Sequence, residues 1–192
     1  MTIQSLSGTE ITPPDNRIKK FRVDHMEFIQ HAINWCKGEI FEGSMFAIYG
    51  TVLVLVSMLF RKIGNTPFTK AMFIPLLVVG LLCIIGGTSL VISNNKRIRE
   101  YQKAFEINRQ EFVKSEKERT DNFIKWYPYT MYVTSVFIVI GIGCYLFWGG
   151  AWGRALGLSI ILLGLSVLFL DHFSEERAES YHQKIVDELE IK

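Results

Sequence analysis

Charged residues are missing from two long stretches of this 192-residue sequence. The stretch from Tyr129 to Leu170 contains 42 residues and one charge, Arg154. As a single helix it would extend about 63 Å, whereas the hydrocarbon core of a bilayer is only about 30 Å thick. Glycine tolerates the backbone of a tight turn and tryptophan favours the headgroup level. The central WGGAWGR segment therefore predicts a turn between two membrane spans, residues 129–148 and 151–170.

A second pair of uncharged runs comes earlier in the chain. Residues 43–60 and 71–93 contain no charged side chain, and the segment RKIGNTPFTK separates them. Uncharged runs of about 20 residues suit a membrane better than the core of a soluble protein. We therefore predict an all-α polytopic membrane protein with four transmembrane helices in two hairpins, 43–93 and 129–170. The remainder is too small and too divided for a separate globular domain.

Acidic residues are absent from the two short segments that join the spans of each hairpin. All 19 Asp and Glu residues lie outside these segments, and only four of the 21 Lys and Arg residues lie in or close to them, namely Arg61, Lys62, Lys70 and Arg154. Because positive residues near short loops are retained in the cytoplasm, we expect both termini to be cytoplasmic, in a bacterial inner membrane. The expected partners are the lipid bilayer and, on the cytoplasmic side, a protein partner or further copies of the chain, but no nucleic acid.

Cysteine is also scarce. The three cysteines, Cys36, Cys83 and Cys144, form neither a disulfide framework nor a metal-binding spacing, so we expect them to be packing residues. The sequence contains no Gly-rich phosphate loop, no Cys–His nucleophile signature and no His-Glu-x-x-His motif. We therefore expect no cofactor, no metal site and no enzymatic activity.

Ionisable residues are missing from the middle of every predicted span. Ion-coupled transporters usually carry such residues there, which disfavours a proton- or sodium-coupled carrier. A pore remains an alternative because hydroxyl side chains occur at several depths, although these more often bond their own backbone or a neighbouring helix. The hydroxyl residues are Thr51, Ser57, Thr88, Ser89, Thr134, Ser135, Ser159 and Ser166.

Apolar residues outside the spans recur mostly at three- and four-residue steps, which is typical of amphipathic helices. After a flexible tail over residues 1–16, we expect three such cytoplasmic helices, in 17–42, 94–128 and 171–192. Their polar faces mix both signs of charge, which argues against a simple basic membrane-surface helix. We expect them to form a layer beneath the spans, partly as continuations of spans two and four. The apolar positions are Ile18, Phe21, Ile29, Ile33, Cys36 and Ile40; Ile98, Tyr101, Phe105, Phe112 and Phe123; and Ala178, Tyr181, Ile185 and Leu189.

The two halves of the sequence share a short motif. RIREYQK follows span two and RAESYHQK follows span four, so that Arg97 and Arg177 each precede a tyrosine by four residues. Together with the paired hairpins, this indicates two parallel units of similar design.

Small residues mark the faces on which membrane helices approach closely. One stripe lies on the fourth span and another on the first, and both predict tight packing, either within one chain or between copies. Tryptophans near the span ends are expected to anchor the helices at the headgroup level. The packing residues are Gly153, Gly157, Gly164, Gly43, Ala47 and Gly50, and the anchors are Trp35, Trp126, Trp148 and Trp152.

Candidate catalytic residues cluster directly after the fourth span. They are Asp171, His172, Glu179 and His182. The last two have the Glu-x-x-His spacing of di-iron bundles, but those sites need two such pairs and two further glutamates. We favour the alternative, a solvated helix end with acid–base pairs.

The sequence therefore predicts a non-enzymatic integral membrane module. Its cytoplasmic helices would interact with further copies or with a partner, in a scaffold, accessory or protective role. A small oligomeric channel or membrane-perturbing effector is the alternative, and an enzyme acting on lipid headgroups is less favoured.

Overall fold

Four long helices make up the described part of the protein. The computed structural model describes the backbone of residues 14–190 and the side chains of residues 28–189. In chain order the helices are α1 (Pro14–Ile63), α2 (Pro67–Ile107), α3 (Arg109–Phe147) and α4 (Gly150–Glu190). Most of the predicted tail, residues 1–13, lies outside the described residues, as do the side chains of Ile18 and Phe21, whereas residues 14–16 belong to α1.

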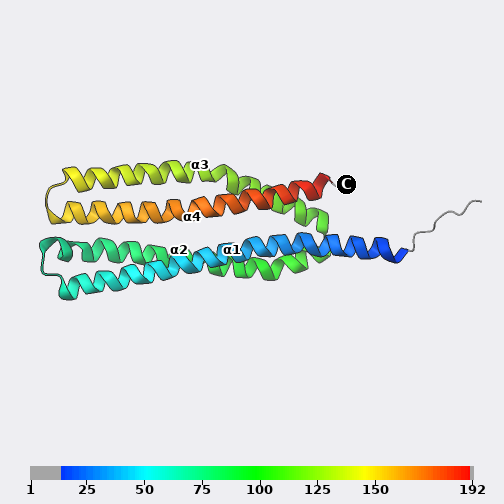
Figure 1. The fold of residues 1–192 in the computed structure, drawn as a ribbon, viewed down its shortest axis with the longest axis horizontal. Coiled ribbons are helices and arrows are strands. Elements are labelled where there is room, and N and C mark those ends of the chain that lie inside the picture. Colours follow the sequence, from blue (N-terminus) through cyan, green and yellow to red (C-terminus); the bar gives the residue numbers. More distant parts are fainter. Residues whose placement is uncertain (1–13, 191–192) are drawn as a thin grey trace, which may run out of the picture.

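The helices form two antiparallel hairpins that lie side by side (Figure 1). α1 packs along α2 and α3 packs along α4, while the two hairpins meet chiefly through α2 and α4. Both hairpin turns lie at one end of the molecule, and the start of α1, the α2–α3 junction and the end of α4 lie at the other (Figure 1). A helix of 41 residues, such as α2, is about 62 Å long. That is roughly twice the thickness of the hydrocarbon core of a bilayer.

Each helix contains a window that is long and apolar enough to cross a membrane. The chain thus has the four long apolar helices of a multi-pass membrane protein, as the sequence predicts. We call residues 43–93 and 129–170 the membrane half, and residues 28–42, 94–128 and 171–189 the polar half.

The prediction of three amphipathic helices in addition to the four spans is wrong, although spans two and four do continue into polar sequence as expected. Within the described chain, the first and third of these segments are the polar ends of α1 and α4 and run into the spans without a break. The second segment is divided at Asn108 into the end of α2 and the start of α3. An uninterrupted helix satisfies its own backbone groups across the boundary, and Gly43, at the first boundary, lies within α1 and does not end it.

Asn108 makes the sharp junction between α2 and α3. Its backbone N–H donates to the Ala104 carbonyl oxygen at 3.1 Å and so closes α2. Its side-chain oxygen accepts from the Glu111 backbone N–H at 3.2 Å and so caps the start of α3. Asparagine is a favoured N-cap because its side chain satisfies a helix donor that has no partner within the helix.

The two hairpin turns are short and rest on local sequence. In the first, the Thr66 and Thr69 side chains each accept from the other residue's backbone N–H at 3.2 Å, and Pro67 occupies the first helical turn. In the second, Trp148 and Gly149 join α3 to α4, and Gly150 adopts a φ of +91°. Glycine reaches this left-handed region without steric cost.

Two apolar clusters hold the bundle together. The first lies in the polar half and takes side chains from all four helices. The second lies in the membrane half and joins α1, α2 and α4. Its buried members are Leu53, Ala71, Met72, Leu76, Val79, Cys83 and Ala155.

Candidate functional site

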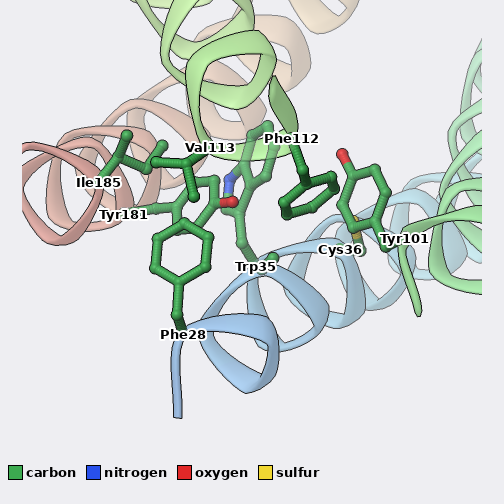
Figure 2. Close-up of a cluster of buried hydrophobic side chains, with 9 residues drawn as sticks. Phe28, Trp35, Cys36, Tyr101, Phe112, Val113, Tyr181 and Ile185 are labelled. Atoms are coloured by element: carbon green, nitrogen blue, oxygen red, sulfur yellow. The ribbon is translucent and has the colours of Figure 1, made fainter. Parts of the chain in front are cut away.

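The polar half is closed around an aromatic core (Figure 2). The Trp35 ring of α1 stacks on the Tyr181 ring of α4 with 5.2 Å between centroids. The Tyr101 ring of α2 meets the Phe112 ring of α3 edge-on at 5.1 Å. Phe28 contacts Phe112 and Tyr181 from the end of the cluster. Most of the expected apolar stripe residues are therefore buried between the four helices.

A buried ion pair lies against this core. The Glu116 carboxylate, whose residue is 3% exposed, accepts from the Arg119 guanidinium at 3.0 and 2.5 Å and from the Tyr181 hydroxyl at 3.0 Å. The guanidinium carbon of Arg119 lies 4.1 Å from the centroid of the Trp35 ring. A charge taken out of water needs such partners, and a cation over an indole face gains further electrostatic stabilisation. Burial and the nearby Glu116 charge raise the pKa of Tyr181, so its hydroxyl stays protonated as a donor.

A second charged network stands where the polar half meets the membrane half. We call Glu39, Glu42, Tyr127, Ser174 and Arg177 the boundary network. The Tyr127 hydroxyl donates to Ser174 at 3.0 Å, and Ser174 donates to Glu39 at 2.9 Å. One guanidinium nitrogen of Arg177 lies 3.3 Å from a Glu39 oxygen and 2.5 Å from a Glu42 oxygen.

Gly38 allows the Arg177 side chain to lie across α1. A Cβ atom at position 38 would come within 2.8 Å of Arg177 Nε. The boundary network thus connects the first helix of one hairpin to the second helix of the other, at the end of the membrane half.

A cavity of about 190 Å³ lies beside the boundary network. Its polar wall includes Glu39, Glu42, Tyr127, Asp171 and Ser174. Among the described residues, Glu42 Oε1 and Asp171 Oδ2 are buried and have no hydrogen-bond partner. Burial raises the pKa of both carboxyl groups. Glu39, Glu42 and Asp171 thus contribute carboxyl groups to a wall that is otherwise largely apolar, and we call this space the acidic cavity.

A larger groove opens between α1 and α4 in the membrane half. It encloses about 650 Å³. Its apolar wall includes Met45 and Phe46 of α1 and Leu165 of α4, and Glu42 and Arg177 stand at its polar end. We call it the α1–α4 groove. Glu42 and Leu170 also line the acidic cavity, so the two spaces share a wall.

The candidate catalytic residues do not converge on one point. Asp171 lines the acidic cavity, whereas the His172 ring packs against Phe173 with 5.5 Å between centroids. His182 lies 3.5 Å from Asp121 and 3.2 Å from the Thr120 hydroxyl, and Glu179 is exposed. Within residues 28–189, no three His, Cys, Asp or Glu side chains are grouped so that they could hold a metal ion.

The small residues of the spans face each other within one chain. A Cβ atom on Gly43 would lie 2.7 Å from the Gly87 carbonyl oxygen, and one on Gly50 would lie 2.5 Å from that of Gly80. Gly87 also faces Ala47. These contacts bring the backbones of α1 and α2 together at two levels.

The second hairpin uses glycine in the same way at one level. A Cβ atom on Gly157 would lie 2.5 Å from the Gly141 carbonyl oxygen. Gly164 faces Ile138 of α3, while Gly153 faces Trp148 at the turn.

The tryptophans divide into two groups. Trp126, Trp148 and Trp152 are exposed, each by more than half of its surface. Trp35, expected at the headgroup level, is instead 5% exposed and belongs to the aromatic core. Trp35 lies on the apolar stripe of its helix and also close to the start of a span. Packing against the other helices buries it, so it does not serve as an exposed anchor.

The span hydroxyls mostly bond their own helix. Five of the eight donate to a backbone carbonyl three or four residues earlier, namely Thr51, Ser57, Thr88, Ser135 and Ser166. Ser159 is buried and lies 4.0 Å from the Met72 sulfur. Hydroxyls that donate to their own backbone in this way offer few free donors to line a pore.

Sequence reasoning missed both buried ion-pair networks. Arg177 and Glu39 are 138 residues apart, and no local pattern connects them. The available signal was the position of Glu39 and Glu42 one turn apart at the edge of an uncharged span. Comparisons with protein-family models, curated proteins and solved structures found no match to this chain.

Proposed function

We propose that the chain is a non-enzymatic integral membrane module that acts through its polar half. In this proposal the polar half and both termini are cytoplasmic, in a bacterial inner membrane, and the polar half binds a protein partner or a second copy of the chain. Such a module would serve in a scaffold, accessory or protective role. The observation that carries the proposal is the closed core of the polar half, formed by all four helices.

This core leaves the polar half with a mostly charged outer surface. Exposed side chains of both signs occur on it, including Glu100, Lys103, Glu118 and Glu179. Surfaces of mixed charge favour specific electrostatic complementarity with a protein more than general attraction to an anionic bilayer. Because each helix continues into a span, a partner bound to the polar half would be held rigidly against the membrane.

The orientation is supported by the distribution of charge. Both hairpin turns lie at one end of the molecule. Only four of the 21 Lys and Arg residues lie in or close to these turns in the sequence. Under the positive-inside rule, this asymmetry favours an orientation in which that end lies outside the cytoplasm.

The proposal is tested by site-specific photocrosslinking in native membranes. A photoreactive residue at position 103 or 118, in the polar half, is expected to trap a discrete product. The matched control is the same residue at position 146, on the exposed lipid-facing side of α3. Mass spectrometry then separates a heteromeric partner from a second copy. Crosslinks that form from position 146 alone would overturn the proposal, as would cytoplasmic accessibility of tags placed at Asn65 and Ala151.

A further inference from the structure

The α1–α4 groove has the form of a site for a lipid chain. Its polar end is at Arg177 and its apolar wall reaches Leu162 on α4. These two residues are 15 positions apart, so the groove follows the helix for about 22 Å. A volume of about 650 Å³ lies within the range of about 300–1,000 Å³ that is typical of ligand pockets. The length and the apolar wall suit one acyl chain of a phospholipid.

The orientation of the groove matches one leaflet of a bilayer. Met45, Phe46 and Leu165 lie within the membrane half, whereas Glu42 and Arg177 stand at its border with the polar half. A lipid with its chain in the groove therefore has its headgroup at the level of the boundary network. This is the leaflet that faces the polar half.

The headgroup end of the groove adjoins more carboxyl groups than basic groups. Among the side chains of residues 28–189, Arg177 is the only basic one that lines either space, and it is already paired with Glu39 and Glu42. Asp171 adds a third carboxyl group to the acidic cavity. A cationic group complements this charge, whereas an anionic headgroup is repelled.

Two buried carboxyl oxygens call for a hydrogen-bond donor as well as a positive charge. Glu42 Oε1 and Asp171 Oδ2 have no partner among the described residues, and an unsatisfied buried polar atom is costly. A primary ammonium carries three N–H donors, like the side chain of lysine. A trimethylammonium headgroup carries the same charge and no donor.

From this geometry we propose that the α1–α4 groove binds one acyl chain of an aminophospholipid, whose primary ammonium lies in the acidic cavity against Glu42 and Asp171. The proposal does not depend on the proposed function, because it needs neither a protein partner nor an orientation across the membrane.

The experiment compares three phospholipids with identical acyl chains. Purified full-length protein is delipidated in detergent, incubated with phosphatidylethanolamine, phosphatidylcholine or phosphatidylglycerol, and analysed by native mass spectrometry. Charge-assisted hydrogen bonds are the stronger class, and the loss of one changes an equilibrium by about tenfold. We therefore expect phosphatidylethanolamine to be retained about tenfold more than phosphatidylcholine, with phosphatidylglycerol retained least. Equal retention of all three lipids would overturn the proposal.

Two substitutions separate the headgroup contact from the groove. Asp171→Asn removes charge from the cavity with little change in shape and is expected to abolish most of the preference for phosphatidylethanolamine. Retention of phosphatidylcholine should fall less, because its trimethylammonium loses the attraction to the charge but no hydrogen bond. Leu165→Trp narrows the groove and is expected to lower retention of all three lipids. Its matched control, Leu146→Trp, makes the same change on the exposed face of α3, where Leu146 is 64% exposed.

Each variant has an outcome that contradicts the proposal. If Asp171→Asn keeps the full headgroup preference, the ammonium does not lie in the acidic cavity. If Leu165→Trp and Leu146→Trp lower retention equally, the chain does not lie in the α1–α4 groove. Thermal unfolding in lipid-free detergent verifies that each variant is folded. If Asp171→Asn does not fold, Glu42→Gln provides a second test of the cavity.

Discussion

Burial of a charged residue in the polar half costs free energy, and hydrogen bonds from neighbouring side chains offset this cost. Glu116 is buried with a full set of partners, and Arg119 supplies two of its hydrogen bonds. Buried ion pairs are worth little compared with well-packed apolar residues, but removal of one partner leaves the other charge uncompensated. The free energy of unfolding should therefore fall by more when one partner is removed than the intact ion pair contributes to it.

Replacement of Arg119 by methionine should destabilise the protein strongly. The Glu116 carboxylate would remain buried without its guanidinium, and we expect a loss of about 3–5 kcal/mol in the free energy of unfolding. Thermal or denaturant unfolding of the purified protein measures it. The matched control is Arg99→Met, because Arg99 is exposed on the polar half. The double variant Glu116→Gln/Arg119→Met should be more stable than Arg119→Met, and the reverse order would show that the pair is not coupled.

The thiol of Cys36 should be inert in the folded protein. Burial raises the pKa of Cys36 to about 11, and only the thiolate is reactive. Below that pH the neutral thiol predominates, so labelling by a hydrophilic maleimide should stay slow from pH 7 to 9 and become fast only on unfolding. A cysteine introduced by Lys37→Cys, at an exposed neighbouring position, is the matched control. Equal labelling of both positions at pH 7 would contradict the closed core.

At the scale of the helices, the hairpins are held by close backbone approach. α1 and α2 contact each other through Gly43 with Gly87 and Gly50 with Gly80. Membrane helices gain no hydrophobic driving force from association within lipid, so such contacts provide van der Waals packing that larger residues prevent. The glycine stripes are thus used inside each hairpin.

Substitution of Gly50 by alanine should loosen the first hairpin. Its Cβ atom would lie 2.5 Å from the Gly80 carbonyl oxygen and 2.8 Å from the Cys83 Cβ, so the helices must move apart. Overpacking of this kind costs about 1–3 kcal/mol, and we expect a lower midpoint of thermal unfolding in detergent. Gly143→Ala is the matched control, because nothing lies within 4 Å of its added Cβ. Equal midpoints for the two variants would argue against backbone contact at Gly50.

The elements were predictable to the extent that local chemistry determines them. Uncharged runs identify the spans, and the glycines beside Trp148 mark the second turn. The junction at Asn108 was missed because asparagine caps helices and also occurs within them, and the stripes on both sides share one period. The continuation of span four into the polar half of α4 was expected, whereas the continuity of α1 was missed, because the change from mixed to purely apolar sequence marks a change of environment, not an end of a helix. Tyr101 and Tyr181, which occupy the same place in the shared motif, both reach the aromatic core, in keeping with two parallel units.

At the scale of the molecule, two distinct cores are joined by continuous helices. The polar half depends on α4 for Tyr181 and Ile185 in its core and for Arg177 at its boundary. The membrane half contains its own cluster, which depends on Ala155 but on no residue beyond the fourth span. Each half therefore has its own buried cluster, although the same four helices run through both.

Truncation after Leu170 should unfold the polar half and spare the membrane half. It removes Tyr181 and Ile185 from the aromatic core and leaves Trp35 and Phe28 with water on one side, while the glycine contacts between the spans remain. Circular dichroism in detergent should show a loss of helix greater than that of the deleted residues alone, and size-exclusion chromatography should show association through the exposed rings. A chain that ends at Glu190 is the matched control and should match the intact protein in both. If the shorter chain stays monodisperse and keeps the helix content of its remaining residues, α1, α2 and α3 hold the polar half without α4, and the aromatic core does not unite all four helices as the structure indicates.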